Sequence, residues 1–485
     1  MNVGRLLLPA VRWDGERGFQ GAWQALEQAL EHSVGGFILF GGEAGAVQEF
    51  TAELRARSAH PLLIASDLER GAGQQFRGAT PLPPAAAIGS LDDLETTRRA
   101  AEITAREARV LGVNWVYAPV ADVDLEPENP IIGTRAFGTD PERVARHVAA
   151  WTRGCAEGGA LSCAKHFPGH GRTLGDSHIE RPCVRTDRHG MELDLLPFRS
   201  AVEAAVDGMM TAHVCYTSLD PSGAPATLSR PILHELLRKE LGFKGLIVTD
   251  ALIMEGLIDQ IDEASAAVAA LQAGCDALLY PEDAGAVKAG VEAALADGRL
   301  RRSRVEEALT RMDRAIARLP STHGKEWGLE VDRRWALQTA IRTLRVVRGE
   351  PKLPAGAVRL IEIEDDLGGP FPPYPRTALP AALRASGVEL SENGEPLVAL
   401  YSDIRAWKGR PGLSSAAKQQ VREVTNLHPG VTVILFSHPR LEHELAQVEN
   451  LLAAWGGEAL MQEAVAASLT GIDDRLPSSA AGLDR

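Results

Sequence analysis

One loop holds most of the groups that could carry out acid–base chemistry. Residues 165–178 read Lys-His-Phe-Pro-Gly-His-Gly-Arg-Thr-Leu-Gly-Asp-Ser-His, so a lysine, three histidines and an aspartate stand among glycines and a proline. Glycine and proline at this density disfavour helix and strand, and the segment is predicted to be a loop. The apolar run Ala160–Ala164 comes just before it. The loop therefore leaves the end of a predicted buried strand, where a rigid scaffold could hold functional groups.

The polar residues of this loop have three interpretations. His166, His170, Asp176 and His178 are of the types that bind metal ions. Pro168 interrupts the helix that would put the first two on one face, so we expect no metal site. The histidines could instead bond the loop backbone. In the third interpretation, Asp176 fixes the tautomer of His178 and raises its basicity, so that the ring transfers a proton near neutral pH.

A second candidate group is the carboxylate of Asp250. An amphipathic helix is predicted to end at Gly242, and the apolar run Gly245–Thr249 then leads directly into Asp250. The aspartate could cap the next helix. It could also act as the nucleophile of a retaining glycosidase, which needs a carboxylate and a proton donor on opposite sides of the scissile bond.

The elements that would position these groups alternate in type over residues 1–320. Short apolar runs, each followed by helix-forming sequence, are typical of strands buried on both faces of a parallel sheet. Eight such strands predict an α/β fold with a (β/α)8 TIM-type barrel, whereas an open doubly wound sheet would show the same alternation with another count. The runs are Arg5–Pro9, Gly36–Phe40, Pro61–Ser66, Val113–Ala118, Ala160–Ala164, Gly208–Ala212, Gly245–Thr249 and Asp276–Tyr280. Asp140 before Pro141 predicts the start of one of the helices.

Polar side chains follow five consecutive strands of this set. They are Asp67, then Asp122 and Asp124, then Lys165 and His166, then His213, and finally Asp250. The carboxyl ends of barrel strands meet at one face, where active sites lie. One aspartate after a strand is usually a cap or turn former, but five strand ends in succession predict a site.

The composition changes after Leu319. Residues 321–334 are predicted to be a linker, and residues 335–485 a smaller α/β sandwich domain. Its predicted strands are Ala357–Ile363, Leu397–Tyr401 and Val431–Phe436, and its predicted helices are Ala416–Asn426, Glu442–Trp455 and Met461–Leu469.

Composition narrows the function classes. The formal net charge of −14 argues against nucleic-acid and anionic-membrane partners. The sequence has no apolar run long enough to cross a bilayer, no secretory core region and no dinucleotide or phosphate-loop motif. Five scattered cysteines without a CxxC pair predict reduced, buried thiols. We therefore expect a cytoplasmic protein that needs no cofactor.

Two stretches resemble glycoside hydrolase family 3, and specifically its bacterial β-N-acetylglucosaminidases. The stretch 165–171 (KHFPGHG), followed by Asp-Ser-His at 176–178, is similar to the K-H-F-P-G-H-G-x4-D-S-H loop of that subgroup. Residues 245–250 (GLIVTD) are similar to the strand that ends in the family nucleophile. The resemblance covers most of residues 1–320 and is weaker from Trp335 to Leu476.

The resemblance implies roles for particular residues. The nucleophile would be Asp250, which forms a covalent glycosyl-enzyme, and His178 oriented by Asp176 would be the acid/base. The residues that match substrate-binding positions are Asp67, Gln75, Arg135, Lys165, His166, His213 and Met254. Gln75 departs from the family, which commonly has a sugar-contacting Arg there, and a glutamine cannot form a charge-assisted fork.

The resemblance implies an exo-acting β-N-acetylglucosaminidase that works by double displacement on muropeptides and related N-acetylglucosaminides. An imidazole acid/base repels phosphate less than a carboxylate would, so a phosphorylase that releases sugar 1-phosphate is one alternative. A β-glucosidase is another, although those generally lack the Asp-Ser-His loop. A sugar-binding protein without catalysis is a third, against which the presence of Asp176, His178 and Asp250 counts.

Overall fold

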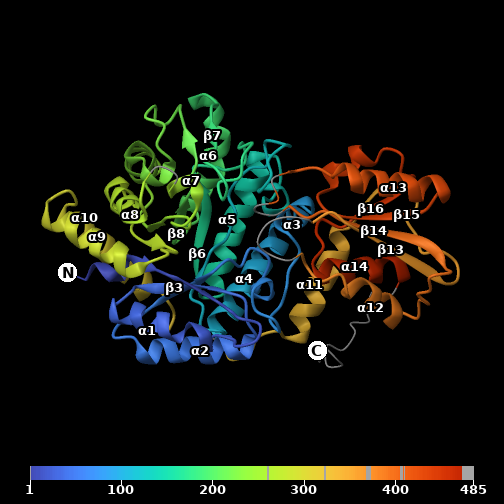
Figure 1. The fold of residues 1–485 in the computed structure, drawn as a ribbon, viewed down its shortest axis with the longest axis horizontal. Coiled ribbons are helices and arrows are strands. Elements are labelled where there is room, and N and C mark those ends of the chain that lie inside the picture. The colour runs from blue at the N-terminus through green and yellow to red at the C-terminus, as the bar shows by residue number, and fades with distance from the viewer. Residues whose placement is uncertain are drawn as a thin grey trace.

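The computed structural model describes residues 2–258, 261–321, 324–366, 373–404, 408 and 410–471. Its N-terminal part is a ring of parallel strands enclosed by helices (Figure 1). The strands are β1 (Leu7–Leu8), β2 (Ala10–Arg12), β3 (Gly36–Phe40), β4 (Leu63–Ser66), β5 (Trp115–Val116), β6 (Leu161–Phe167), β8 (Gly208–Thr211), β10 (Leu246–Val248) and β11 (Leu278–Leu279). Each lies within or overlaps one of the predicted runs or, for β2, directly follows one.

Pairing of these strands runs round the ring. Seven form one sheet in the order β10-β8-β6-β5-β4-β3-β2, and β11 pairs in parallel with β1. A bridge between Val248 and Ala277 connects β10 to the segment that enters β11. Every residue of β6 is buried, as expected for a strand covered on both faces. The prediction of a TIM-like α/β domain is confirmed.

Helices cover the outside of the ring between successive strands. They are α1 (Trp23–Glu31), α2 (Ala44–Arg57), α3 (Ala85–Ser90), α4 (Leu94–Val110), α5 (Pro141–Glu157), α6 (Arg188–Glu203), the π-helix η6 (Pro231–Glu240), α7 (Glu255–Ile258), α8 (Glu263–Ala273), α9 (Ala284–Ala296) and α10 (Arg302–Ala317). The predicted start at Asp140 is confirmed, because its side chain accepts hydrogen bonds from the Glu142 and Arg143 amides at the head of α5. Short 3-10 turns lie at η1 (Val3–Leu6), η2 (Gln20–Ala22), η3 (Ala72–Gln74), η4 (Gly133–Arg135) and η5 (Ala226–Leu228).

The C-terminal part is built on a second sheet, drawn in orange and red in Figure 1. Its five strands follow the order β12-β16-β15-β14-β13, all parallel except for the antiparallel pair of β12 with β16. The strands are β12 (Arg345–Arg348), β13 (Val358–Glu364), β14 (Glu395–Tyr401), β15 (Thr432–Phe436) and β16 (Asn450–Ala453), and the helical segments are α11 (Glu330–Thr343), α12 (Ala378–Ala385), α13 (Ser415–Leu427), η7 (Pro439–Leu445) and α14 (Ala459–Thr470). Two separate apolar clusters fill the two faces of the sheet.

One element of this part differs from the sequence prediction. The segment Glu442–Trp455 was expected to be a helix, but it divides into the end of η7 and the strand β16. Leu451, Leu452 and Ala453 are buried in the sheet. An apolar run between two layers suits a buried strand as well as a helix, and pairing with β12 and β15 decides for the strand.

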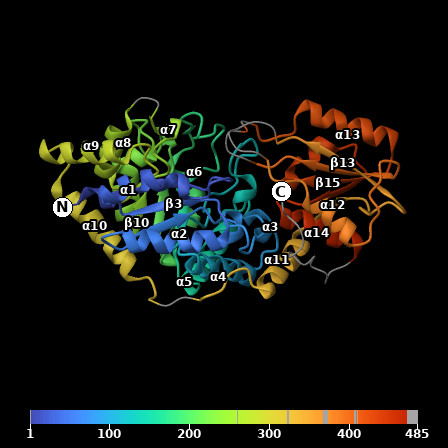
Figure 2. The same ribbon diagram turned by 60° about the horizontal axis from the view of Figure 1, so that its bottom comes forward.

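The two parts lie side by side, and the views in Figures 1 and 2 agree on this. Trp455, Leu460, Met461 and Ala464 of the C-terminal part join the apolar cluster of the barrel, against which Trp335 of α11 also packs. In the ranges that the structure describes, no helix is both long and apolar enough to span a membrane. Residues 472–485 of the predicted second domain and residues 322–323 of the predicted linker lie outside the described residues.

Candidate active site

A buried network of ion pairs lies at the carboxyl ends of β4 and β6. The Lys165 ammonium, whose side chain is 2% exposed, donates to Asp67 Oδ1 at 2.6 Å and contacts Glu69 Oε1 at 2.7 Å. The Arg135 guanidinium forks onto the same Glu69 carboxylate, with distances of 2.8 and 3.0 Å. Two cations and two carboxylates, carried by β6, by η4 and by the loop after β4, thus form one connected network, which we call the charged floor.

The charges of this network stabilise one another. Burial alone would raise the pKa of Glu69, but the charges of Arg135 and Lys165 hold it well below its ordinary value. Burial would lower the pKa of Lys165, but the Asp67 and Glu69 carboxylates raise it instead. Glu69, Lys165 and Arg135 are therefore charged at neutral pH, and the network presents fixed donors and acceptors that suit vicinal hydroxyl groups.

His166 is held in one orientation beside this network. Its Nδ1 lies 2.7 Å from Asp122 Oδ2, and its own backbone amide donates to the same carboxylate. The Asp122 carboxylate also accepts from the His170 backbone amide at 2.6 Å. Asp122 therefore holds Nδ1, and Nε2 has a long contact of 3.5 Å with Arg135 Nη2.

The loop after β6 brings His178 and Asp176 together as predicted for a dyad. The ring Nδ1 of His178 lies 2.7 Å from Asp176 Oδ1, and the His178 backbone amide donates to that oxygen at 3.0 Å. Asp176 is buried, whereas the His178 side chain is 22% exposed. The carboxylate holds Nδ1 and so fixes the orientation of a partly exposed imidazole, which is an arrangement suited to proton transfer.

His170 has a structural part in the same loop. Its Nε2 bonds Ser177 Oγ at 2.9 Å and its Nδ1 bonds Thr173 Oγ1 at 2.8 Å. Burial, followed by the neighbouring His166, lowers the pKa of His170 to about 4. It is a neutral internal tie at neutral pH, and its ring bonds two side-chain hydroxyls and not the loop backbone that the second interpretation named.

Asp250 follows β10 directly and is not at the start of a helix. Its Oδ1 accepts a hydrogen bond from the Ala251 amide at 2.8 Å, and the next helix, α7, begins only at Glu255. Burial alone would raise the pKa of Asp250, but the nearby His166, His213 and His178 rings lower it below its ordinary value. The carboxylate is therefore ionised at neutral pH and has the imidazole of the dyad within its electrostatic surroundings.

The structure gives His213 a partner on each ring nitrogen. Its Nδ1 bonds Thr227 Oγ1 at 2.7 Å and its Nε2 bonds the Ala251 carbonyl at 3.0 Å. The ring is fully buried and holds the backbone next to Asp250. Met254 is also buried, three residues beyond Ala251, and its amide donates to the Ala251 carbonyl.

Gln75 lies in the loop after β4 together with Asp67. Its Oε1 accepts a hydrogen bond from the Gly41 amide at 3.1 Å, so the side chain connects the loops that follow β3 and β4. This bond uses the oxygen of the amide and leaves its NH₂ group as the end available to a ligand.

Two residues of the site were given no role by the sequence: Glu69 was not named, and Asp122 was named only as a polar residue after a predicted strand. Glu69 bridges Lys165 and Arg135, and Asp122 orients His166. The sequence offered a signal for each, because Glu69 is two residues beyond Asp67 and Asp122 follows a predicted strand. In the described part of the chain, no group of three or more His, Cys, Asp or Glu side chains has the arrangement of a metal site.

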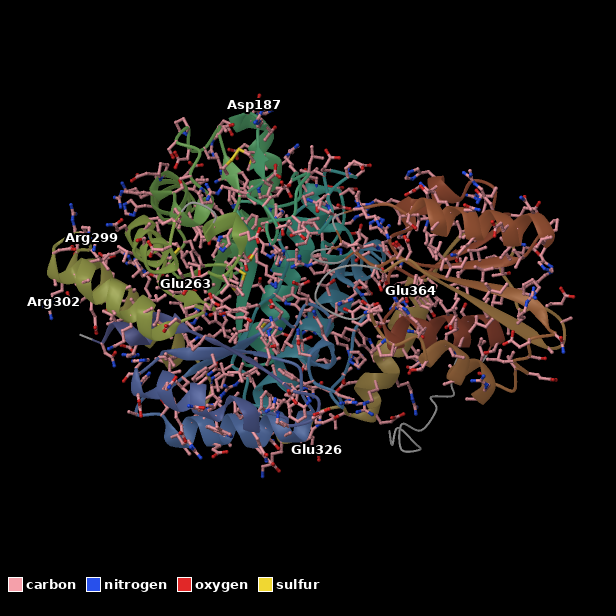
Figure 3. The ribbon with its side chains drawn as sticks, in the orientation of Figure 1. Asp187, Glu263, Arg299, Arg302, Glu326 and Glu364 are labelled. Atoms are coloured by element: carbon pink, nitrogen blue, oxygen red, sulfur yellow. A yellow bond between two sulfur atoms is a disulfide. The ribbon has the colours of Figure 1, made fainter. Side chains whose placement is uncertain are left out.

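The expectation that all cysteines are reduced is wrong for one pair. Cys183 and Cys215 form a disulfide across the short parallel pair of β7 (Cys183–Val184) and β9 (Cys215–Tyr216), seen as a yellow bond in Figure 3. They are 32 residues apart in the chain, and only the pairing of these two strands brings them together. The disulfide fastens the segment just after His178 to the one just after His213. Cys155, Cys163 and Cys275 are free and buried.

The barrel therefore carries an ionised carboxylate, a His–Asp pair and a charged floor on one face, which is the equipment of an enzyme acting on a polyhydroxylated substrate. Residues 3–315 match the glycosyl hydrolase family 3 N-terminal domain. The chain belongs to glycoside hydrolase family 3, and it is a glycoside hydrolase.

The relatives and solved structures that resemble this chain cover different shares of its length. A β-hexosaminidase of Nitrosomonas eutropha is 38% identical over 261 residues, which are 52% of this chain and 74% of the relative. A β-N-acetylglucosaminidase/β-glucosidase of Cellulomonas fimi is 34% identical over 299 residues, 58% of this chain and 51% of that protein. Among solved structures, a family 3 β-N-acetylglucosaminidase from Paenibacillus sp. str. FPU-7 superposes with a TM-score of 0.84 at 27% identity, covering 97% of this chain and 96% of the other.

Proposed function

We propose that this chain is a retaining exo-β-N-acetylglucosaminidase. In this proposal Asp250 attacks the anomeric carbon and forms a covalent glycosyl-enzyme while His178 Nε2 protonates the departing oxygen. The same imidazole then takes a proton from water, whose oxygen displaces Asp250. Asp176 keeps the ring in the tautomer that this cycle needs.

The observation that carries the proposal is that Asp250 and His178 have different surroundings within one site. A nucleophile must be ionised, and the neighbouring imidazoles keep the pKa of Asp250 low. A proton shuttle must have an oriented ring with an exposed edge, and the 2.7 Å bond from Asp176 to His178 Nδ1 meets that need. Separate environments for nucleophile and acid are what a retaining mechanism requires.

The floor of the site supports the assignment of sugar-binding groups. Asp67, Lys165 and Arg135 offer a carboxylate and two cationic donors to sugar hydroxyls, and His166 presents its Nε2 edge. We infer that His213 and Met254 shape the wall beside Asp250. Gln75 would reach the sugar only through its NH₂ group, since its oxygen accepts from Gly41.

The proposed substrates are muropeptides and other N-acetylglucosaminides, and the sequence predicted a cytoplasmic location. The similarity to β-hexosaminidases supports the sugar, while the Cys183–Cys215 disulfide favours an oxidising compartment over the cytoplasm. Cell fractionation in the source organism would decide the location. We also propose that residues 1–320 are the catalytic domain, 321–334 the linker and 335–485 an α/β sandwich domain.

Removal of the nucleophile tests the proposal. On a 4-nitrophenyl β-N-acetylglucosaminide, Asp250→Ala should lower kcat by at least about 10⁴-fold, because no covalent intermediate can form. Asp283→Ala is the matched control, since Asp283 also follows a barrel strand but caps α9 by accepting from the Ala286 amide. If Asp250→Ala retains wild-type turnover, Asp250 is not the nucleophile.

A phosphorylase remains the second candidate because the proton shuttle is an imidazole and not a carboxylate. An imidazole does not repel a phosphate dianion approaching the glycosyl-enzyme, as a carboxylate would. Product analysis by NMR with and without phosphate separates the two. Sugar 1-phosphate appearing only with phosphate would replace the hydrolase assignment, and free N-acetylglucosamine in both would retain it.

A further inference from the structure

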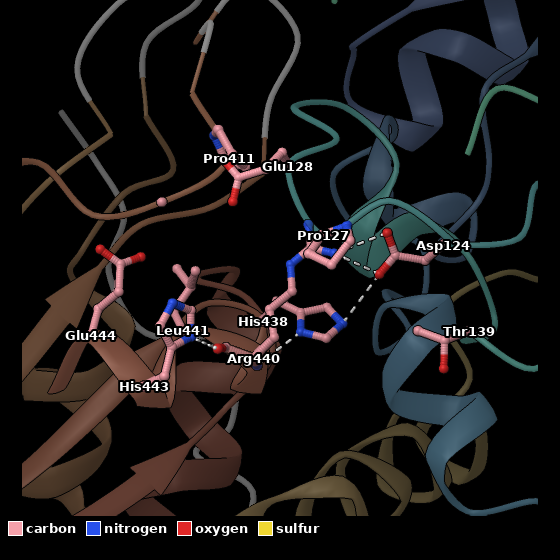
Figure 4. A pocket seen from close by; sticks show the side chains of 11 residues that line it. Asp124, Pro127, Glu128, Thr139, Pro411, His438, Arg440, Leu441, His443 and Glu444 are labelled. Atoms are coloured by element: carbon pink, nitrogen blue, oxygen red, sulfur yellow. Dashed lines mark hydrogen bonds and ion pairs between the residues drawn. The ribbon is translucent and has the colours of Figure 1, made fainter. Parts of the chain in front are cut away.

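One arginine of the C-terminal part reaches across to a loop of the barrel. Arg440, in η7, donates from Nη1 to both carboxylate oxygens of Asp124 at 2.9 and 2.8 Å (Figure 4). Its Nη2 donates to the Asn129 carbonyl at 3.4 Å. The Asp124 side chain is 1% exposed and that of Arg440 16%. The contact is therefore a largely buried ion pair, in which one guanidinium nitrogen contacts both carboxylate oxygens, between segments 316 residues apart.

The Asp124 carboxylate depends on this arginine for its charge compensation. Burial raises the pKa of Asp124 above its ordinary value even though Arg440 lowers it. The His438 ring also lies near Asp124, at 3.7 Å, but burial and then Arg440 lower its pKa to about 3, so it is neutral. Without Arg440 the carboxylate would have to take up a proton or move toward water, and the loop that carries it would move as well.

The same barrel loop is bonded to the loop that holds the dyad. The fully buried Asn129 side chain donates to the carbonyls of His170 and Thr173 at 2.9 and 3.0 Å. The Glu126 amide donates to the Gly171 carbonyl at 3.1 Å. Gly171 has no room for a side chain, since a Cβ there would lie 1.7 Å from the Val123 carbonyl oxygen. Residues 124–129 thus lie between Arg440 and the His178 loop.

The loop also leads into a sugar-binding candidate. It continues through Gly133 to Arg135, which forks onto Glu69. Ile404 of the C-terminal part packs on Gly133 so closely that a Cβ at this glycine would lie 1.9 Å from Ile404 Cδ1. Contacts from the C-terminal part therefore reach the loop at both ends, near Asp124 and near Arg135.

We propose that Arg440 is a positioning residue for the glycosidase reaction: its bonds to the Asp124 carboxylate and the Asn129 carbonyl hold loop 124–135, and through that loop it sets the places of the His178–Asp176 dyad and of Arg135. The proposal rests on the proposed function. It gives the C-terminal part a role in turnover without any contact of its own with the reacting atoms. A displacement of about 1 Å in such a constellation can cost on the order of 10²-fold in rate.

The test compares Arg440→Met with a matched arginine of the same part. Arg410 pairs with Asp365 at 2.9 Å, and both lie in the C-terminal part, so Arg410→Met removes a similar half-buried ion pair without touching the barrel. On a 4-nitrophenyl β-N-acetylglucosaminide at 25 °C, Arg440→Met should lower kcat about 10-fold or more. Arg410→Met should stay within about twofold of wild type, even if both lose similar thermal stability.

Two further measurements separate positioning from folding. Arg440→Lys keeps the charge but loses the second nitrogen that donates to the Asn129 carbonyl, so it should recover only part of the lost kcat. The loss in Arg440→Met should be larger on an alkyl glycoside than on the nitrophenyl one, because a poor leaving group depends more on protonation by a well-placed His178. A folded Arg440→Met with wild-type kcat on both substrates would overturn the proposal, and if that variant does not fold, a wild-type kcat in Arg440→Lys would overturn it equally. Failure of the proposed function is distinct, because wild-type enzyme would then release no N-acetylglucosamine.

Discussion

One cluster of buried charge lies at the carboxyl ends of the barrel strands, and another lies at the carboxyl ends of the parallel strands of the second sheet. Only the first cluster has the parts of an active site. In the barrel, Asp67, Glu69, Lys165 and Arg135 form the charged floor. In the second sheet the corresponding cluster follows β13 and β14 and consists of Asp365, Asp366, Asp403, Arg376, Lys408 and Arg410. Glu364, labelled in Figure 3, lies on the side of that sheet that faces the barrel.

The two sites differ in whether a carboxylate is left without an Arg or Lys partner. In the second sheet Asp365 pairs with Arg410, and Asp366 pairs with Arg376 and Lys408. In the barrel, Asp250 has no Arg or Lys ion pair among the described residues and is ionised by nearby imidazoles. We therefore propose a structural role for the second cluster, and we propose that Asp250, which has no strong cation beside it, is the nucleophile.

The two buried lysines allow the largest test of this comparison. Lys165 and Lys408 are 2% and 4% exposed, and each binds carboxylates. Replacement by methionine leaves buried carboxylates without their cation and should cost about 3–5 kcal/mol of stability in either variant. Lys165→Met should also lower kcat/KM on the order of 10²-fold through the lost charged hydrogen bonds to the sugar, while Lys408→Met should keep kcat/KM. Unfolding curves and steady-state kinetics at 25 °C measure both, and equal activity losses would refute the distinction.

A second test uses the acidic pair of the second sheet. Burial, and then the charge of Asp366, raises the pKa of Asp403 to about 7, whereas an unfolded aspartate titrates near about 3.9. The folded state therefore binds more protons between these values, so this contribution to stability is complete below about pH 4 and is lost as the pH rises to about 7.

Asp403→Asn removes this titration, so the loss of folding stability with rising pH should be smaller than in wild type. We expect its Tm to exceed that of wild type by about 2–4 °C at pH 8 and the advantage to disappear near pH 4, as measured by calorimetry. Activity should be unchanged at both pH values relative to wild type. A variant that is less stable than wild type at pH 8 would show that the Gly457 amide and Arg376, which both face Asp403, need the charge.

The smallest expected effect concerns the border of the active site. Gln75→Ala removes the acceptor for the Gly41 amide and should cost about 1 kcal/mol of stability. If the side chain serves to join the loops after β3 and β4, KM for the aryl glycoside should change less than about threefold. A tenfold rise in KM with unchanged stability would instead make Gln75 a direct contact of the sugar.

Much of the barrel could be predicted because its signals are local. The period of the apolar runs specifies buried parallel strands, and the polar residues directly after them mark the face where the site lies. The Asp140–Pro141 helix start needs only its own side chain and the next amides. The pairing of Asp176 with His178 is of this kind too, since the two are separated by one residue.

The local pattern was insufficient where a partner comes from a distant segment. Residues 450–453 have an apolar pattern that suits either a helix or a strand, and only their neighbours in the sheet decide for β16. Cys183 and Cys215 carry no spacing signal, and the pairing of β7 with β9 joins them.

The sequence by itself determined the strands of the barrel, the loop that ends at His178 and the position of Asp250 after its strand, because periodicity and turn residues act over a few neighbours. The prediction that this loop starts at Lys165 is wrong, because pairing with β8 extends β6 to Phe167, so Lys165 and His166 lie in the strand. The tertiary structure alone decided that Glu69 bridges Lys165 and Arg135, that Gln75 binds Gly41, and that Arg440 holds Asp124. Each of these depends on charge and hydrogen-bond complementarity between chain segments that only the packing of strands and helices brings within reach.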